Sequence, residues 1–240
     1  LYGKQQLHVL LEKLSKIKEI EWIRILYTHP RHFYPELIHV ISQQDKICKY
    51  IDLPIQHIND TILAKMGRNV THAYIQSLID DLRSHIDSLF LRTSVIVGFP
   101  GETEEHFAEL LEFVKTTQFE RLGVFTYSKE ENTPAASFKK QIPQKIKEQR
   151  LKKVMLTQQE IVLRKHKNLM GNSIPVIIDE KSESNDDWLG RSYGDAPDVD
   201  SKVIIQGNHL KAGDIKNMVI TGTAGYDLTA TSIKNGKRIK

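Results

Sequence analysis

The alternation of helical and strand-like segments over the first half of the chain restricts its fold more than any other feature. From the start to about Ser128, apolar residues with helical spacing alternate with short β-rich runs. The repeat is about 30 residues long, as in βαβ units. Strands that are joined through helices lie parallel, and a parallel sheet must be covered on both faces. We therefore expect an α/β domain with a parallel sheet, either open or rolled into a barrel.

The positions of the elements follow from the same spacing. Strands are expected at residues 22–27, 49–53, 91–97 and 121–127. Helices are expected near residues 7–14, 35–42, 60–67 and 71–86 and from residue 103 onward. Asp60, Thr71 and Thr103 are predicted to cap three of these helices, because short polar side chains accept hydrogen bonds from free amides at a helix start.

The second half of the chain has a different pattern. A polar loop with two prolines leads to a long basic helix that is expected from Pro143 to about Met170, with Gly171 as its carboxyl-terminal cap. Turn residues then separate five short strands, which are expected at residues 174–178, 188–192, 203–205, 217–221 and 226–229. Short strands with Asp, Gly and Asn turns predict a small antiparallel barrel of the OB or a related kind.

The charge of the chain is unevenly distributed. Residues 172–230 contain 10 Asp and Glu against 5 Lys and Arg, although the whole chain has a net charge of +4. A net-acidic module binds phosphate backbones poorly and suits a basic partner better. We divide the chain into a main domain (1–142), a linker helix (143–171), a small acidic domain (172–232) and a basic tail (233–240).

Composition excludes several classes of protein. No apolar run reaches the roughly 18 residues that a membrane-spanning helix needs, and no signal-peptide pattern opens the chain. We therefore expect a cytoplasmic protein. Cys48 is the only cysteine, so the chain cannot form an internal disulfide or a cysteine-ligated cluster. The chain begins with Leu1, in what resembles a helix already under way, and we expect further sequence upstream.

The turn Gly98-Phe99-Pro100-Gly101, named the GFPG turn below, is the first candidate site. It follows the predicted strand 91–97, and ligands of parallel sheets bind at the carboxyl ends of the strands. Glycines let the backbone approach a ligand closely, and Glu102 adds a carboxylate. A well-formed loop between strand and helix, without a ligand, is the alternative.

Polar residues also follow other predicted strands, and we expect them at the same carboxyl-terminal edge of the sheet. His29 and His32 could suggest a metal pair, but a proline lies between them and no third ligand is evident, so no metal site is predicted. His57 could transfer a proton or orient a substrate, or could be a surface or capping histidine. Arg68 could bind a carboxylate or could be a solvated cation.

A third candidate lies in the small domain. Residues 190–198 read Gly-Arg-Ser-Tyr-Gly-Asp-Ala-Pro-Asp, which combines a cation, an aromatic ring and polar turn residues. The sequence indicates either a turn-rich hairpin loop or a surface that contacts a protein or a nucleic-acid loop.

Four segments of this chain closely resemble segments of the radical-SAM methylthiotransferases. They are residues 50–57 (Tyr-Ile-Asp-Leu-Pro-Ile-Gln-His), 91–103, 121–128 and 190–198, in the family's order. The resemblance covers nearly the whole chain. It implies a partial parallel (β/α) barrel of the radical-SAM type, followed by a small all-β TRAM barrel. It also implies S-adenosyl-L-methionine as a cofactor and two 4Fe-4S clusters in the full-length family, whose cysteine ligands are absent from this chain.

Within the family, the segments resemble the branch that methylthiolates the β-carbon of an aspartate in ribosomal protein S-twelve. Both the 190–198 segment and the acidic small domain favour this branch over the tRNA-modifying one. The implied partners are ribosomal protein S-twelve or the small ribosomal subunit, with RNA contact through the TRAM domain as a further possibility. Three alternatives stay open: a tRNA methylthiotransferase, a non-catalytic module that binds ribosome or RNA, and an unrelated barrel enzyme that binds phosphate at the GFPG turn.

The resemblance also implies roles for individual residues, although it identifies no catalytic residue in this chain. The residues expected to bind the cofactor are Gln56, Val97, Gly98, Phe99, Glu102, Val124 and Phe125. The residues expected to bind substrate are Arg68, Arg191, Tyr193 and Asp195.

Overall fold

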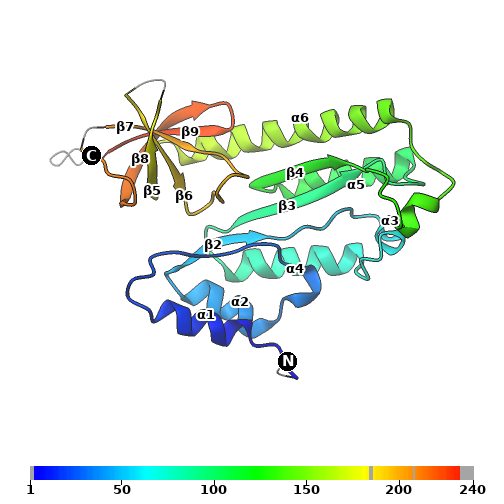
Figure 1. Cartoon of the computed structure of the whole chain (residues 1–240), viewed down its shortest axis with the longest axis horizontal. Coiled ribbons are helices and arrows are strands. Elements are labelled where there is room, and N and C mark those ends of the chain that lie inside the picture. The colour runs from blue at the N-terminus through cyan, green and yellow to red at the C-terminus, as the bar shows by residue number, and fades with distance from the viewer. Residues whose placement is uncertain (1–2, 184–185, 208, 233–240) are drawn as a thin grey trace. The chain divides into compact units, whose positions relative to one another are not determined.

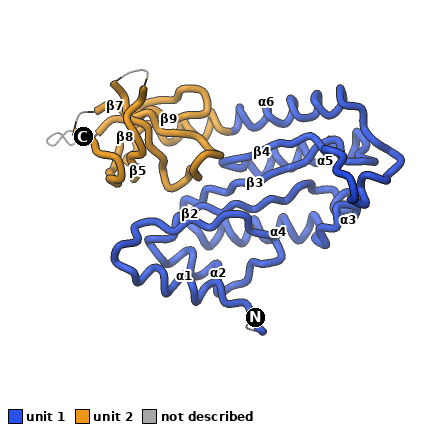
Figure 2. The backbone as a smooth tube through the Cα atoms, in the orientation of Figure 1, with its two compact units in different colours: residues 1–161 blue, residues 162–240 orange. Residues whose placement is uncertain are grey.

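The structure, a computed structural model, describes residues 3–183, 186–207 and 209–232. It divides into two units, residues 1–161 and residues 162–240 (Figure 2). The basic tail that was predicted at residues 233–240 lies outside the described residues. The four-part division made from the sequence stays a prediction.

A parallel sheet of four strands, in the order β1-β2-β3-β4, organises the first unit (Figure 1). Each strand pairs in parallel with the next one, as the helix-strand alternation predicts. The elements of this unit in chain order are α1 (Leu7–Ser15), β1 (Ile23–Ile25), η1 (Pro30–His32), α2 (Pro35–Gln43), β2 (Ile47–Asp52), α3 (Asp60–Lys65), α4 (His72–His85), β3 (Phe90–Val97), α5 (Glu104–Thr117), β4 (Arg121–Thr126), η2 (Pro134–Ser137) and α6 (Gln144–Leu169), which continues into the second unit.

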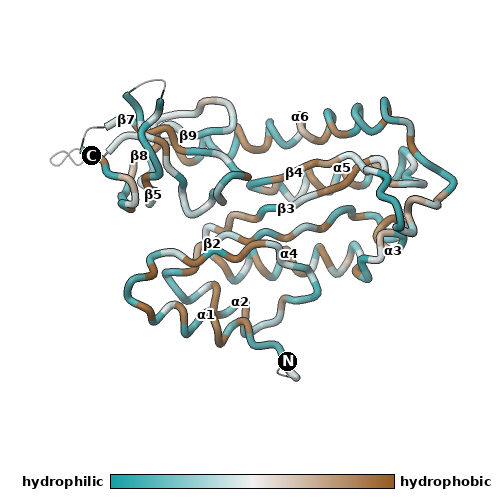
Figure 3. The backbone as a smooth tube through the Cα atoms, viewed as in Figure 1, coloured by the Kyte–Doolittle hydropathy of each residue, from teal (hydrophilic) through white to brown (hydrophobic). Residues whose placement is uncertain are grey.

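The core of the first unit lies between this sheet and its helices. Hydrophobic residues are dense along β2 and β3 and recur along α1 and α2 (Figure 3). One continuous cluster joins strand residues such as Ile51 and Val95 to helix residues such as Leu82 and Val114. Cys48 is buried in β2 as a small residue of this core. Burial of apolar surface from several consecutive βα units therefore stabilises the edge of the sheet where their loops meet.

The helix starts show which local predictions were sound. Thr71 and Thr103 are the N-caps of α4 and α5, and each hydroxyl accepts a hydrogen bond of 3.2 Å from the amide three residues ahead. The prediction for Asp60 was wrong by one residue. Asn59 caps α3 instead, because its Oδ1 accepts from the amides of Thr61 (3.0 Å) and Ile62 (3.2 Å).

The second unit contains a closed barrel of five strands in the order β5-β6-β7-β9-β8. Its own cluster of buried residues, which includes Val176, Ile205 and Ile220, fills the interior. The expectation of a purely antiparallel barrel was wrong for one pair, since β7 and β9 run parallel. The strands are β5 (Ser173–Lys181), β6 (Trp188–Ser192), β7 (Val203–Gln206), β8 (Ile215–Ala224) and β9 (Asp227–Ser232).

No helix within the described ranges is both long and apolar enough to cross a membrane.

Candidate functional site

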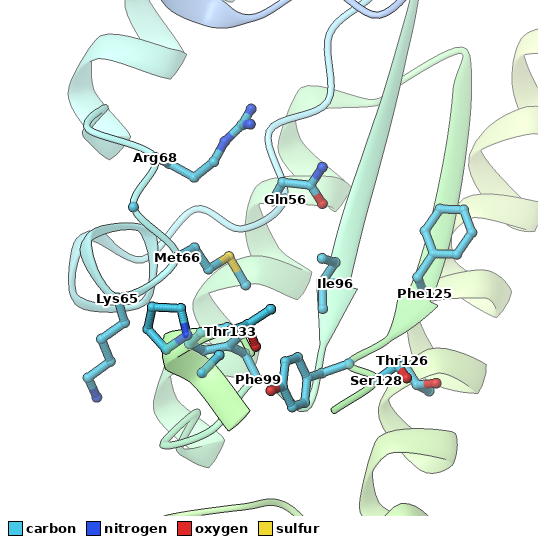
Figure 4. A pocket seen from close by; sticks show the side chains of 14 residues that line it. Gln56, Lys65, Met66, Arg68, Ile96, Phe99, Phe125, Thr126, Ser128 and Thr133 are labelled. Carbon is cyan, nitrogen blue, oxygen red and sulfur yellow. The ribbon is translucent and has the colours of Figure 1, made fainter. Parts of the chain in front are cut away.

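A cavity of about 570 Å³ opens at the carboxyl ends of β3 and β4 (Figure 4). Pockets of this size hold small-molecule ligands and cofactors. Residues from the loop after β2, from α3 and the turn after it, from β3 and the GFPG turn, from β4 and from the loop with η2 line the cavity. They are Gln56, Lys65, Met66, Gly67, Arg68, Ile96, Phe99, Phe125, Thr126, Tyr127, Ser128, Thr133, Pro134 and Ala135.

Gln56 reaches the cavity because its backbone extends the sheet for one residue. Its amide donates to the Ser94 carbonyl (2.9 Å), and its carbonyl accepts from the Ile96 amide (2.7 Å). Its φ of 69° lies in the left-handed region, which is uncommon for a residue with a side chain. The side-chain amide of Gln56 points toward the cavity, where it can donate and accept hydrogen bonds (Figure 4).

Arg68 supplies a cation beside Gln56 (Figure 4). Its Nη2 donates to the Pro54 carbonyl, which fixes the guanidinium, while its buried Nε has no hydrogen-bond partner within the described part of the chain. Burial lowers the pKa of Arg68, but a guanidinium stays protonated in proteins. Burial and then the charge of Arg68 also lower the pKa of His29. The site thus has a fixed positive charge in its lining.

Aromatic rings form another part of the lining. Phe99 packs edge-to-face against Tyr127 (centroids 5.2 Å apart) and Phe138 (6.1 Å). Phe125 is 55% exposed, whereas Phe99 is only 5% exposed. Figure 4 shows both rings at the cavity. The exposed ring of Phe125 offers an apolar planar surface on which a heterocycle can stack.

The buried carboxylate of Glu102 stabilises the GFPG turn through hydrogen bonds to the backbone of the turn. It is 2% exposed, and its Oε2 accepts from the amides of Gly98 and Phe99, the latter at 3.1 Å. Nη1 of Arg150, on α6, lies 3.3 Å from the same oxygen. The carboxylate therefore ties the turn to α6 and fixes the backbone of Phe99 at the cavity.

Gly98 is a glycine for two structural reasons. Its φ of +74° is unfavourable for a residue with a side chain. In addition, a Cβ atom at this position would overlap the Cγ atom of Lys147 on α6. The Nζ of Lys147 donates to the Tyr127 carbonyl (2.7 Å), so this side chain is itself held in place.

The structure places three of the seven predicted cofactor residues at the cavity. Gln56, Phe99 and Phe125 line the cavity and so does the predicted substrate residue Arg68, whereas Val97, Gly98, Glu102 and Val124 do not. Thus three cofactor residues and one substrate residue make up this group. Val97 is fully buried, and Val124 packs against the main core. The side chain of Glu102 is turned into the protein, so we assign it to the turn and not to ligand contact.

The histidines of the strand ends have hydrogen-bond partners on the backbone. His57 is fully buried; its Nδ1 accepts from the Asn59 amide (3.0 Å), and its Nε2 lies 3.8 Å from Glu102 Oε1. Because it is fully buried, His57 is not the surface histidine that the sequence allowed as an alternative. His29 Nδ1 accepts from the Arg31 amide (3.2 Å). Within the described ranges no group of three possible metal ligands occurs.

The three substrate residues predicted in the second unit form its local scaffold. Arg191 makes a two-point salt bridge with Asp179 (2.8 and 2.7 Å), which raises the pKa of the guanidinium. Asp195 is 1% exposed and accepts from the amide (3.2 Å) and the hydroxyl (2.5 Å) of Ser192. Tyr193 is half-buried. Contact of these residues with a substrate stays a prediction.

Several lining residues were not singled out from the sequence. Met66 and Gly67 end α3, and Thr133, Pro134 and Ala135 come from the polar loop after β4. The sequence had signalled that loop only by its two prolines. The last three residues of the family-like segment 121–128, Thr126, Tyr127 and Ser128, also line the cavity.

Hydrogen bonds to the carboxylate of Glu109 on α5 predict a pH effect. Burial alone would raise the pKa of Glu109, but hydrogen bonds from Asn59 Nδ2 (2.7 Å) and His72 (3.0 Å) outweigh it and hold the pKa below its ordinary value of 4.5. A lowered folded-state pKa adds stability above the unfolded-state pKa, and this is lost as the pH falls through the folded value. We expect Glu109→Gln to flatten the decline of the urea midpoint below about pH 4.5. An unchanged decline would contradict this assignment.

Comparison with protein families gives two matches. The model of the radical SAM superfamily matches residues 4–114, and the model of the TRAM domain matches residues 170–233. Together with the parallel sheet and the closed barrel, these matches define a radical SAM domain followed by a TRAM domain.

Individual relatives place the chain within that superfamily. It is 47% identical over 236 residues to "Ribosomal protein uS12 methylthiotransferase RimO" of Carboxydothermus hydrogenoformans, covering 98% of this chain and 54% of the relative. It is 46% identical to the protein of the same name from Alkaliphilus oremlandii, covering 99% of this chain and 55% of the relative. The chain belongs to the radical SAM methylthiotransferase family, RimO type, and it spans about half the length of these curated relatives.

Among solved structures, the chain resembles coproporphyrinogen III oxidase (HemN) from Escherichia coli, described as a radical SAM enzyme. The TM-score is 0.49 at 16% sequence identity, and the match covers 78% of this chain and 49% of that one. At this level the similarity carries no argument about function.

Proposed function

We propose that this chain is the carboxyl-terminal portion of a radical SAM methylthiotransferase that transfers a methylthio group to the β-carbon of an aspartate in ribosomal protein uS12 (S-twelve). The observation that carries the proposal is sequence identity of 46% over nearly the whole chain with a relative of that name. Cytoplasmic localisation belongs to the same proposal, since ribosomes are the source of the substrate.

The cavity fits S-adenosyl-L-methionine by its chemistry. This ligand combines a planar heterocycle, a ribose and an amino-acid end with a carboxylate. The exposed ring of Phe125 provides an apolar surface for the heterocycle. Gln56 can hydrogen-bond a polar group, and the guanidinium charge of Arg68 in the cavity lining suits the carboxylate. We therefore assign the cofactor-binding role to the cavity and leave Glu102 out of it.

The two 4Fe-4S clusters of the family must be held elsewhere. Cys48 is the only cysteine of these 240 residues and is buried in β2, so this chain has no ligand set for such a cluster. In the full-length protein the cluster and the bound cofactor would supply the radical chemistry. The residues of this chain would bind and orient the cofactor and exclude water from it.

The small acidic domain supports a basic protein as partner. Residues 172–230 carry 10 acidic against 5 basic side chains, which attracts a basic ribosomal protein and repels the backbone of tRNA. This charge favours the ribosomal branch over the tRNA-modifying one.

The test uses the full-length protein that contains this chain, with reconstituted clusters, S-adenosyl-L-methionine, a sulfur source and a reductant. Mass spectrometry is expected to find a methylthio group on an aspartate of uS12. Modification of tRNA with uS12 untouched would move the protein to the tRNA branch. Modification of neither, with intact clusters, would favour a non-catalytic binding module.

Phe125→Ala tests the cavity separately. Because stacking on an aromatic ring is worth about 1–3 kcal/mol, we expect the dissociation constant of S-adenosyl-L-methionine to rise on the order of tenfold. Equilibrium dialysis with labelled cofactor measures this in the full-length protein. Stability should change little, because Phe125 is 55% exposed. Tyr226→Ala, at an exposed aromatic of the second unit, is the control; equal affinity of the wild type and Phe125→Ala would remove this ring from the site.

A further inference from the structure

A strip of lysines lies on the outer surface of the segment that leads into α6 and of the helix itself. Residues 139–153 contain 7 Lys and Arg and one acidic residue, Glu148. Five of these basic side chains are exposed and form what we call the basic strip: Lys139, Lys140, Lys145, Lys152 and Lys153.

The other two cations of the segment point inward and have partners. Lys147 bonds the Tyr127 carbonyl, and Arg150 pairs with Glu102 and with Glu104. By contrast, none of the five lysines of the basic strip forms an ion pair within the residues that the structure describes. The fold therefore pairs two cations of the segment. Of the five exposed lysines, Lys153 has its Nζ 5.9 Å from the centroid of the Phe107 ring, and the other four have no ion pair or ring contact within the described residues.

The basic strip extends from the edge of the cavity along the helix. The carbonyl of Lys140 accepts from the Gly101 amide (2.8 Å), which places the start of the strip against the GFPG turn. Lys65, at the edge of the cavity in Figure 4, approaches the same glycine. Lys145 and Lys152 are two helical turns apart, on one face, at a separation of about 10 Å.

The composition of the strip fits a phosphate backbone better than a protein. Protein interfaces are depleted of lysine and rely on large apolar or aromatic anchors. None of the exposed large apolar side chains in the described structure lies between residues 139 and 153. Lysine is a compact point charge that binds phosphate without reading the base, and several in a row release counterions from a polyanion.

We infer that the basic strip binds the phosphodiester backbone of RNA, so that α6 and not the acidic TRAM domain carries the RNA contact. RNA is chosen because this inference rests on the proposed function: a ribosomal-protein substrate is surrounded by RNA. Binding of this kind is independent of sequence and weakens steeply with salt. It would hold the RNA beside the edge of the cavity.

Fluorescence anisotropy with a labelled RNA duplex tests this inference on the full chain. The triple variant K140E/K145E/K152E is expected to bind on the order of tenfold more weakly and to have a shallower dependence on salt, because each lost phosphate contact reduces the slope by about 0.7 to 0.9. The matched control K13E/K16E/K18E changes the net charge equally, at exposed lysines around the end of α1. It should bind as the wild type does. Urea unfolding checks that both variants fold.

Two results would overturn the inference: equal losses in the two triple variants, or binding of poly-glutamate as tight as that of RNA at the same charge. A DNA duplex bound equally well would support backbone recognition without reading of the sugar.

The full-length enzyme separates this inference from the proposed function. If the K140E/K145E/K152E variant loses RNA binding but modifies isolated uS12 normally, the strip binds RNA without taking part in the methylthiolation. If the wild type binds RNA but never modifies uS12, the proposed function is wrong, whereas the RNA-binding role of the basic strip still holds.

Discussion

Replacing Glu102 with glutamine is expected to lower the free energy of unfolding of the first unit by roughly 3 to 5 kcal/mol, the cost of breaking a buried ion pair from one side. Glu102 is 2% exposed and Arg150 is 5% exposed. The substitution keeps the size of the side chain but leaves the Arg150 cation next to a neutral amide. Its effect is therefore electrostatic, and the amides of Gly98 and Phe99 also lose a charged acceptor.

The measurement can be confined to the first unit. The chain has two tryptophans, Trp22 in the first unit and Trp188 in the second, so Trp22 fluorescence in a Trp188→Phe background follows urea unfolding of the first unit. Glu104→Gln is the matched control, because Glu104 pairs with the same arginine but its side chain is 79% exposed. We expect that change to cost less than about 1 kcal/mol. Equal costs for the two variants would show that Glu102 is not the tie between the GFPG turn and α6.

Replacing Gly98 with alanine is expected to cost roughly 2 to 4 kcal/mol, as the sum of backbone strain and overpacking. The backbone strain follows from the φ of +74° at this position. The overpacking arises because the new Cβ atom would overlap the Cγ atom of Lys147, close to the helix backbone, where the side chain has little freedom to move away. We expect α6 or the GFPG turn to shift, and cofactor affinity of the full-length protein to fall with it.

Gly67→Ala separates the two contributions to this cost. Gly67 has a similar φ of +69°, but no atom lies within 4 Å of the position that its Cβ would take. The alanine there should therefore show backbone strain alone, about 1 kcal/mol. The same Trp22 assay measures both variants. A cost at Gly98 no greater than the cost at Gly67 would mean that Lys147 does not constrain the turn.

Local patterns were sufficient for much of the fold. The strand expected at residues 91–97 is β3 (Phe90–Val97), and the one expected at 121–127 is β4 (Arg121–Thr126). Thr71 and Thr103 cap their helices because capping needs only a hydroxyl and an amide three residues ahead. The parallel pair β7 and β9 was missed because strand order in a barrel depends on contacts between segments far apart in sequence.

The residues that line the cavity were predicted from the sequence only in part. Gln56, Phe99 and Phe125 were expected from the family resemblance, and the structure places all three at the cavity where the carboxyl ends of the parallel strands meet. Met66 and Pro134 were missed because helix ends and loops carry no periodic signal. Glu102 was assigned to a ligand because nothing near it in sequence offered it a partner.

The sequence by itself determined the alternating elements, the change of architecture after the long helix, the acidic small domain and the family. Each of these depends on the order of residues or on their local spacing. Only the tertiary structure decided what the GFPG turn does. Lys147 and Arg150 reach it from α6, almost fifty positions along the chain from Gly98 and Glu102, and they make the glycine and the carboxylate structural necessities. Because these contacts with α6 fix the GFPG turn, Phe99 is held at the cavity.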